Sequence, residues 1–250
     1  MVSKNLQKLI HSLAHKKYRL QNNMFVAEGP KVVGDLMKRM QPKMIVATNE
    51  WIIDNSQYIS DSTQTVCVNA DELRQVSFLQ HPQQVLALFP LQIPATEYDL
   101  QKDLLLALDG VQDPGNLGTI IRIADWFGIK NILCSQNTAD AFSPKVVQAT
   151  MGSIARVNIT YCDLETTLSN FAKQGIPLYG TLLDGNNIYH EQLADHGIII
   201  MGNEGNGISE GIRNIITHKL LIPSFTKNDD HAESLNVAIA TAITLSEFRR

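Results

Sequence analysis

The chain has 250 residues, of which 44% are hydrophobic and 18% charged, an ordinary composition for a soluble globular protein with one large domain or two modest ones. Its longest apolar runs, such as Leu104–Leu108, are far too short to cross a bilayer, and no apolar secretory signal follows Met1. We therefore expect a cytoplasmic protein without membrane spans.

Three widely spaced cysteines, Cys67, Cys134 and Cys162, leave at least one thiol unpaired. No Cys-x-x-Cys pair or Cys/His cluster offers a zinc site, so no metal is expected. We expect these cysteines to be buried apolar thiols in a reducing compartment.

The charge is distributed unevenly around a formal net charge of −4. Residues 1–40 carry eight Lys/Arg and two acids, a net +6, so the remaining 210 residues carry −10. A basic N-terminal region on an acidic body indicates local attraction to a polyanion. The same charge run is also compatible with a solvated helix face.

Two prolines between residues 90 and 96 mark the best domain boundary. Before it, Leu6, Ile10 and Leu13 recur at helical spacing, and short strand-like runs follow. These runs are 24–27, 44–47, 65–68 and 85–89. The pattern predicts a small α/β domain over residues 1–90, a linker over 91–102 and a second domain over 103–250.

In the second domain, apolar strands alternate with helical patterns. The expected strands are 104–108, 131–134, 156–160, 178–182, 198–201 and 219–222; the expected helices are 118–127, 144–153, 164–173, 209–216 and 235–248. This alternation predicts a parallel sheet covered on both faces. In such sheets the ligand lies at the carboxyl ends of the strands, so the loops that follow the strands are the candidate site.

The first of these loops, residues 109–118, turns into a helix that carries Asn116 and Arg122. It lacks the Gly-x-Gly-x-x-Gly pattern of a dinucleotide site and the Walker pattern of a nucleotide triphosphate site. The second loop, residues 202–209, has three glycines within six positions and an acid, Glu204, which is poorly suited to packing. Either loop alone is compatible with a plain turn.

The third loop runs from Ile222-Pro223 to Ser234-Leu235-Asn236 and enters a helix that is apolar nearly all round. Ser234 could cap this helix by satisfying amides that are otherwise free at its start. Ser234 and Asn236 could also present a hydroxyl and an amide to a substrate.

Together the three loops resemble the three sequence motifs of the SpoU/TrmH family of RNA 2′-O-methyltransferases. The matching stretches are Asn116-Leu117-Gly118-Thr119-Ile120-Ile121-Arg122, then Met201-Gly202-Asn203-Glu204-Gly205, then Ile222-Pro223 with Ser234-Leu235-Asn236-Val237. Less specifically, the first ninety residues resemble the family's substrate-binding domain, which has a ribosomal-protein-like RNA-binding fold. That similarity depends on the segments 10–13, 16–19 and 25–29.

The resemblance implies an α/β fold with a deep trefoil knot in the C-terminal parallel-sheet domain, a smaller N-terminal RNA-binding domain, and a homodimer. It implies that S-adenosylmethionine is the cofactor, held mostly by backbone groups at Gly202, Ile222 and Leu235, with Thr181 a further candidate. It also implies that the substrate is RNA, ribosomal RNA being favoured over transfer RNA.

The implied reaction moves a methyl group to a ribose 2′-hydroxyl. Arg122 is the family's candidate for activating that hydroxyl. Because a guanidinium almost never gives up its proton, we expect Arg122 to grip the adjacent phosphate and stabilise developing alkoxide charge. The other expectation for Arg122 is an ion pair with Asp125. Asn116, Glu204, Ser234 and Asn236 are expected to orient Arg122 and the ribose.

Lys16, Lys17 and Arg19 are the candidate contacts to RNA phosphates. Tyr18, between them, could stack on a base or belong to the core. The chain departs from the family at Ser224, where a methionine is usual, and in a longer bridge over residues 224–232. The alternatives are a non-catalytic RNA-binding relative acting in ribosome assembly and, less favoured, a nicotinamide-dependent oxidoreductase.

Overall fold

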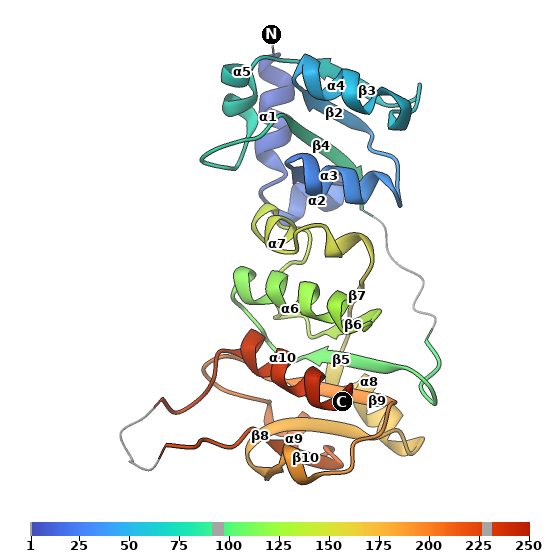
Figure 1. Ribbon diagram of the computed structural model, residues 1–250, viewed down its shortest axis with the longest axis vertical. Helices are drawn as coiled ribbons and strands as arrows, with labels where there is room; N and C mark the ends of the chain where they lie inside the picture. The colour runs from blue at the N-terminus through green and yellow to red at the C-terminus, as the bar shows by residue number, and fades with distance from the viewer. Residues whose placement is uncertain (1, 92–97, 227–231) are drawn as a thin grey trace. The chain divides into compact units, whose positions relative to one another are not determined.

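The computed structural model describes residues 2–91, 98–226 and 232–250. The chain divides into two compact units. Unit 1 comprises Met1–Ile93 and Asp140–Ala155, and unit 2 comprises Pro94–Ala139 and Arg156–Arg250. The segment 140–155 therefore packs with unit 1, although the sequence pattern grouped it with the second domain. Figure 1 labels most of the helices and strands of both units.

Unit 1 is built on a mixed four-stranded sheet of order β1-β4-β2-β3. Both β1 and β2 are antiparallel to β4, whereas β2 and β3 are parallel. The strands are β1 (Met24–Glu28), β2 (Met44–Ala47), β3 (Gln64–Cys67) and β4 (Val85–Pro90). The helices are α1 (Lys4–Ser12), α2 (Lys16–Asn22), α3 (Pro30–Met37), α4 (Asn49–Asn55), α5 (Ala70–Val76) and α7 (Pro144–Ala149), with 3-10 turns η1 (Ser56–Tyr58) and η2 (Ser153–Ala155).

Helix α1 forms where the sequence predicted it, because Ser3 caps its first turn and its apolar residues share one side. The Ser3 hydroxyl oxygen accepts a hydrogen bond from the Leu6 N–H at 3.2 Å. Ile10 and Leu13 are fully buried and pack with Val26 of β1 and Leu86 of β4. The opposite side of α1, which carries Lys4, Lys8 and His11, stays exposed.

Unit 2 is built on a six-stranded sheet of order β10-β8-β9-β5-β6-β7, and every strand pair in it is parallel. The strands are β5 (Leu104–Leu108), β6 (Asn131–Cys134), β7 (Asn158–Tyr161), β8 (Leu178–Asn187), β9 (Gly197–Met201) and β10 (His218–Leu221). The helices are α6 (Pro114–Trp126), α8 (Leu164–Lys173), α9 (Glu210–Arg213) and α10 (Val237–Phe248), with a 3-10 turn η3 (Ile188–His190). This confirms the predicted parallel sheet.

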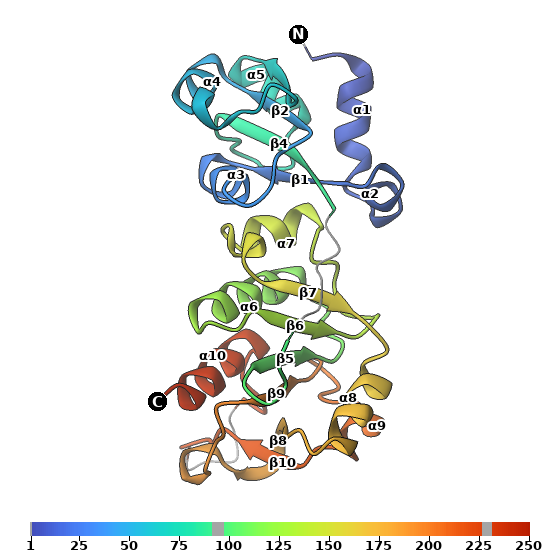
Figure 2. The same ribbon diagram turned by 90° about the vertical axis from the view of Figure 1, so that its right-hand side faces the viewer.

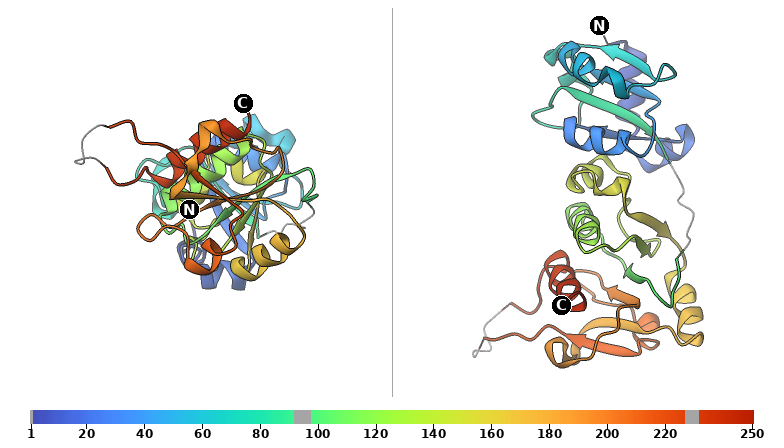
Figure 3. Two further views of the ribbon diagram at one scale, coloured as in Figure 1. Left: turned by 90° about the horizontal axis from the view of Figure 1, so that it is seen from below. Right: turned by 45° about the vertical axis from the view of Figure 1, so that its right-hand side comes forward.

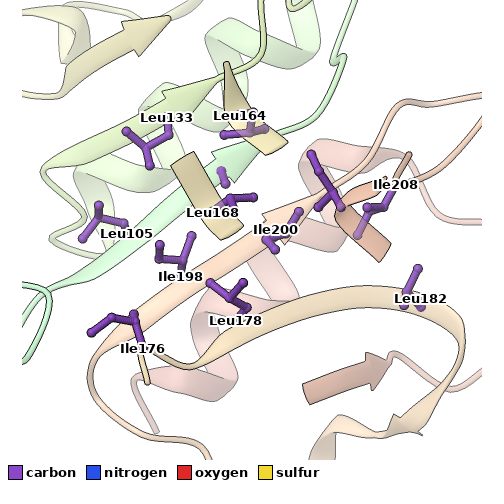
Figure 4. Packing of buried hydrophobic residues seen from close by; sticks show 12 residues of the cluster. Leu105, Leu133, Leu164, Leu168, Ile176, Leu178, Leu182, Ile198, Ile200 and Ile208 are labelled. Atoms are coloured by element: carbon purple, nitrogen blue, oxygen red, sulfur yellow. The ribbon is translucent and has the colours of Figure 1, made fainter. Parts of the chain in front are cut away.

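Helices cover both faces of this sheet (Figure 2). On one face, Leu164 and Leu168 of α8 and Ile212 of α9 pack against Leu105 of β5 and Ile198 of β9. Figure 4 shows this cluster from close by. On the other face, α6 and α10 lie side by side, as Figure 3 also shows. Central strands that are apolar on both sides are the expected result of such double cover.

Some element boundaries differ from the predicted ones, for local reasons. Helix α6 begins at Pro114 rather than at residue 118, because Asp113 caps it and proline suits a first helical turn. The helix expected over 144–153 ends at Ala149, because Met151 and Gly152 take positive φ values of 52° and 96°. Strand β8 continues to Asn187 because its far end pairs with β10.

All three cysteines are free, but Cys67 is exposed on β3 and Cys162 is half-buried, so the expectation of buried thiols is confirmed only for Cys134. Burial raises the pKa of Cys134, and that thiol is inert. Over the ranges that the structure describes, no helix is both long and apolar enough to cross a bilayer. In the same ranges no group of three or more His, Cys, Asp or Glu side chains could hold a metal ion.

Candidate active site

The loops after β5 and β9 are joined by a buried and half-buried polar scaffold in unit 2. Asn203 donates its Nδ2 to the Gly110 carbonyl at 2.7 Å, and its Oδ1 accepts from the N–H groups of Gly205 and Asn206, each at 2.9 Å. Beneath this, the Asp109 carboxylate accepts from the Ser209 N–H at 2.7 Å. Two loops separated by some ninety residues are thus held as one surface at the carboxyl edge of the sheet.

Glu204 projects from the second loop onto the first. Its carboxylate accepts from the Asn116 side-chain amide at 3.0 Å and from the backbone N–H groups of Gln112 at 3.3 Å and Asp113 at 3.4 Å. Desolvation raises the pKa of Glu204, but the hydrogen bonds from Asn116 and from backbone N–H groups outweigh it, and the net pKa lies below the usual value. Glu204 is therefore an ionised acceptor and a poor proton acceptor in catalysis.

Asn236 brings the third loop into the same network. Its Nδ2 donates to the Asn116 Oδ1 at 2.9 Å. Its own Oδ1 accepts from the N–H groups of Ala238 at 3.0 Å and Ile239 at 3.3 Å, so Asn236 is the N-cap of α10. The expectation that Ser234 caps this helix is wrong. Ser234 is exposed and makes no hydrogen bond with any residue that the structure describes.

The Asn116 amide is consequently fixed in orientation. Its Nδ2 is committed to Glu204 and its Oδ1 to Asn236, which leaves one N–H and one lone pair for a substrate. The Asn236 amide also keeps one N–H, because its Nδ2 donates only one hydrogen bond, to Asn116. These groups are suited to holding a ribose hydroxyl.

Helices α6 and α10 run parallel, with both N-termini at this network. At the start, Asn236 is bonded to Asn116 in the first turn of α6. At the far end, the Arg249 Nε donates to the carbonyl of Phe127, the C-cap of α6, at 3.1 Å. The two helices are therefore tied at both ends, and the position of Asn116 depends on their packing.

The second loop is closed by a tight turn in which Gly202 is required for space. Asn203 and Gly207 exchange backbone hydrogen bonds at 2.9 and 3.0 Å across it. A Cβ on Gly202 would lie 2.4 Å from the Gly207 carbonyl carbon and 2.5 Å from the Ile208 nitrogen. Neither neighbour is a flexible side chain, so no other residue fits without moving the loop.

The residues expected to bind the cofactor follow β9 and β10 or precede α10. Gly202 and Ile222 are half-buried, and Leu235 is exposed by 49%. The backbone N–H and C=O groups of these three residues make no hydrogen bond to another loop residue that the structure describes. These backbone groups are therefore available to a ligand. Thr181, in β8, instead donates its hydroxyl to the Ile200 carbonyl at 3.2 Å. This donor set fits a ligand recognised through backbone groups.

Arg122 does not join the network. It lies six residues after Asn116, which is about 9 Å along α6 and a third of a turn around it. It is exposed, on one side of α6 with Thr119 and the 85% exposed Trp126. The expected ion pair with Asp125 is not formed; Asp125 binds Arg156, whose Nη2 lies 2.8 Å away. Within the described part of the chain, no hydrogen bond or ion pair holds the Arg122 guanidinium.

The candidate RNA contacts in unit 1 have different surroundings. Lys16 and Lys17 are exposed, and the Lys17 Nζ lies 5.9 Å from the centre of the Tyr18 ring. Arg19, by contrast, is 2% exposed. It donates to the carbonyls of Leu13 at 2.6 Å and Ala14 at 2.8 Å, and it pairs with Asp140 at 2.6 Å. These contacts make Arg19 a structural residue and leave little of its guanidinium for RNA.

The sequence pattern missed two parts of the site. Asn203, in the motif Gly202-Asn203-Glu204, was not singled out, although its side chain joins the first two loops. The backbone N–H groups of Gln112 and Asp113 also escaped notice, because a backbone donor has no residue signature. An Asn beside a Gly-rich turn was the available signal for Asn203.

Comparison with family models supports the resemblance to the SpoU/TrmH family. The model described as the SpoU rRNA Methylase family matches residues 103–246, and that described as the MRM3-like substrate binding domain matches residues 5–87. A Bacillus subtilis relative, the 23S rRNA (guanosine(2553)-2′-O)-methyltransferase RlmP, is 31% identical over 94% of this chain and 92% of its own length.

Two solved structures are similar along the whole chain. A protein from Porphyromonas gingivalis assigned to the TrmH family of RNA methyltransferases is 42% identical with a TM-score of 0.88, covering 99% of this chain and 98% of its own. An AdoMet-bound rRNA methyltransferase from Sinorhizobium meliloti is 28% identical with a TM-score of 0.87, covering 100% and 95%. Fold, motif geometry and family match agree, and the chain belongs to the SpoU rRNA methylase family.

Proposed function

We propose that this protein transfers a methyl group from S-adenosylmethionine to the 2′-hydroxyl of a guanosine ribose in 23S ribosomal RNA, acting in the cytoplasm. The observation that carries the proposal is the hydrogen-bonded series Glu204–Asn116–Asn236, which joins all three loops at one sheet edge. The choice of ribosomal over transfer RNA and of guanosine follows the activity named for the Bacillus relative. A non-catalytic RNA-binding relative would have no need of this network.

Bound S-adenosylmethionine supplies a sulfonium methyl, an electrophile that needs no metal. The backbone groups of Gly202, Ile222 and Leu235 would hold it, with Thr181 a further contact. The chain's own residues must then hold the ribose oxygen in line with that methyl, which removes much of the entropic barrier. The free N–H of Asn116 and the free N–H of Asn236 are placed to fix the ribose.

Charge stabilisation has to come from Arg122. Two helix N-termini meet at the network, but the carboxylates of Asp113 and Glu204 occupy that of α6, and the neutral Asn236 amide caps that of α10. The network itself therefore offers no net positive charge to an oxygen that is losing its proton. Arg122 would grip the phosphate next to the ribose and stabilise the developing alkoxide, and the hydroxyl proton would leave to solvent water, not to the guanidinium. Ser234, exposed beside this site, would contact the substrate and not the helix.

The working unit would be a homodimer. The exposed sides of α6 and α10 carry Trp126, 85% exposed near the end of α6, and Ile239, 53% exposed in the first turn of α10, and these side chains would pack against the second copy. Arg122 lies on the same side of α6, so this interface would place it against a second copy. Subunit exchange between Arg122→Ala and Asn116→Ala proteins would then restore activity that neither variant has alone. Sedimentation of Trp126→Glu should show a monomer.

The domain division, the knot and the basic residues of unit 1 belong to the same proposal. The division into a substrate-binding domain over 1–90, a linker over 91–102 and a methyltransferase domain over 103–250 is supported by the two family matches. The trefoil knot of the second domain is supported by family membership. Lys16 and Lys17 would contact RNA phosphates. Arg19 would position α2 by pairing with Asp140.

The test is methyl transfer from radiolabelled S-adenosylmethionine to a 23S ribosomal RNA transcript. Transfer should be lost when the target nucleotide carries a 2′-deoxyribose, because the acceptor oxygen is then absent. Mapping of 2′-O-methyl marks in cells with and without the gene identifies the nucleotide. If calorimetry shows no binding of S-adenosylmethionine, the proposal fails and the non-catalytic alternative is favoured.

A further inference from the structure

A shallow groove of about 500 Å³ runs along the exposed side of α1 in unit 1. Its lining residues are Lys4, Gln7, Lys8, His11, Ser12 and His15. None of them is acidic, and all can still donate a hydrogen bond to a ligand except Ser12, whose hydroxyl donates to the Leu9 carbonyl at 2.7 Å. The groove therefore offers donors and positive charge to a ligand rich in acceptors.

Helical spacing explains why these side chains form a row. Lys4 and Lys8 are four residues apart, or about 6 Å along the axis, and His11 extends the same side by one further turn. His15 continues the row as the residue before α2. The opposite side of α1 is anchored by the fully buried Ile10 and Leu13, so the row cannot rotate away from solvent.

The two lysines of the groove are unpaired among the described residues, whereas several other lysines have carboxylate partners. Lys38 lies 3.0 Å from Asp35, and Lys102 lies 2.8 Å from Asp99. Lys4 and Lys8 make no ion pair or hydrogen bond with any part of the chain that the structure describes. Over the described ranges no carboxylate neutralises their charge, which is therefore available to a polyanion.

Aromatic rings border the row. The His11 ring lies 6.0 Å from the ring of Phe78, and the His15 ring lies 6.3 Å from that of Tyr18. Tyr18 is 40% exposed, with Lys17 over its ring. Unpaired cations interleaved with exposed rings are typical of surfaces that bind RNA, whose bases stack while its phosphates take the charge. An acidic protein partner would use the cations but not the rings.

We propose that this α1 groove is a second RNA contact surface, in which Lys4 and Lys8 bind consecutive backbone phosphates and the His15–Tyr18 edge receives an unpaired base. It lies outside the methyltransferase machinery and extends the basic surface from Lys16 and Lys17 along the whole of α1. The identity of the RNA rests on the proposed function. The groove supplies affinity and does not take part in the chemistry.

The test compares full-length wild type with Lys4→Gln/Lys8→Gln. The probes are a fluorescein-labelled hairpin of 23S ribosomal RNA and a labelled single-stranded RNA of mixed sequence. The double variant should bind both RNAs about tenfold more weakly at low salt. Its plot of log affinity against log salt should be shallower by about one per lysine. In methyl transfer, KM should rise while kcat stays unchanged, because only uniform binding is removed.

The matched control is Lys38→Gln/Lys102→Gln. It also removes two positive charges, but from lysines that already have carboxylate partners. It should retain the affinity and the salt slope of wild type. Equal losses in both double variants, or no loss in Lys4→Gln/Lys8→Gln, would overturn the groove assignment. Failure of the proposed function is distinguishable, because wild type itself would then neither bind S-adenosylmethionine nor methylate RNA.

Discussion

Asn236 performs two tasks that substitution can separate. Its Oδ1 caps α10, and its Nδ2 holds the Asn116 amide. Asn236→Ala removes both. Asn236→Asp keeps a cap oxygen, and aspartate caps helices as well as asparagine does, but it removes the donor to Asn116. The two variants should therefore agree in activity and differ in stability.

The magnitudes follow from the contacts. Loss of an N-cap side chain costs about 0.5–2 kcal/mol, and loss of the hydrogen bond to Asn116 costs about 1 kcal/mol, so Asn236→Ala should lose about 2 kcal/mol of unfolding free energy. Asn236→Asp should lose less than about 1 kcal/mol, because its negative charge at the α10 N-terminus is favourable and the lost hydrogen bond is exposed to water. In the aspartate variant, two carboxylates, at 204 and 236, compete for one Asn116 amide, which then loses its fixed orientation.

Urea unfolding measures the stability of each variant, and single-turnover methyl transfer measures its activity. Both variants should lower the rate of methyl transfer by at least tenfold, since about 1.4 kcal/mol of lost transition-state stabilisation has that effect. Calorimetric affinity for S-adenosylmethionine should change little in Asn236→Asp. A fully active Asn236→Asp, or one as unstable as Asn236→Ala, would refute the division of tasks.

Three further predictions concern the same site. Arg122→Ala should abolish methyl transfer with the affinity for S-adenosylmethionine nearly unchanged, and equal turnover by the variant would contradict the role of the cation. Gly202→Ala should cost about 1–3 kcal/mol and weaken cofactor binding in calorimetry, because its Cβ collides with loop backbone; wild-type affinity would argue against this. The folded-state pKa of Glu204 is lowered, so its stabilisation is present above the usual value of 4.5 and lost as pH falls below it. Urea unfolding should show wild type exceeding Glu204→Gln by about 1 kcal/mol or less at pH 7, and a gap that persists below the lowered pKa would contradict this.

Much of the fold was predictable because its signal is local. The apolar runs 104–108 and 131–134 are bounded by turns, and β5 and β6 have those bounds. Helix α8 likewise has the predicted bounds of 164–173, between the Asp163 cap and Gln174. The predicted boundaries failed where long-range pairing decides them, as at β8, whose last residues are ordered by β10.

The site was predicted in part. Asn116, Glu204 and Asn236 meet as the motif spacing implied, since the loops after parallel strands share an edge. The cap of α10 was misassigned because Ser234 and Asn236 have nearly equal capping preference, and only the backbone conformation selects between them. The burial of Arg19 could not be foreseen either, because its partner Asp140 is 121 residues away.

The exposure of Arg122 bears on how many chains a complete site needs. A guanidinium that serves an active site is ordinarily oriented by acceptors around it, because five donors in a flexible side chain otherwise sample many positions. The hydrogen bonds of the network join Asn116, Glu204 and Asn236 to one another and to helix N-termini. None of these bonds involves Arg122. Asp125, the nearest acid along α6, is committed to Arg156. None of the residues that the structure describes supplies acceptors that orient Arg122. Under the proposed function and the proposed dimer, those acceptors would come from the RNA or from a second copy, so both proposals depend on the same side of α6.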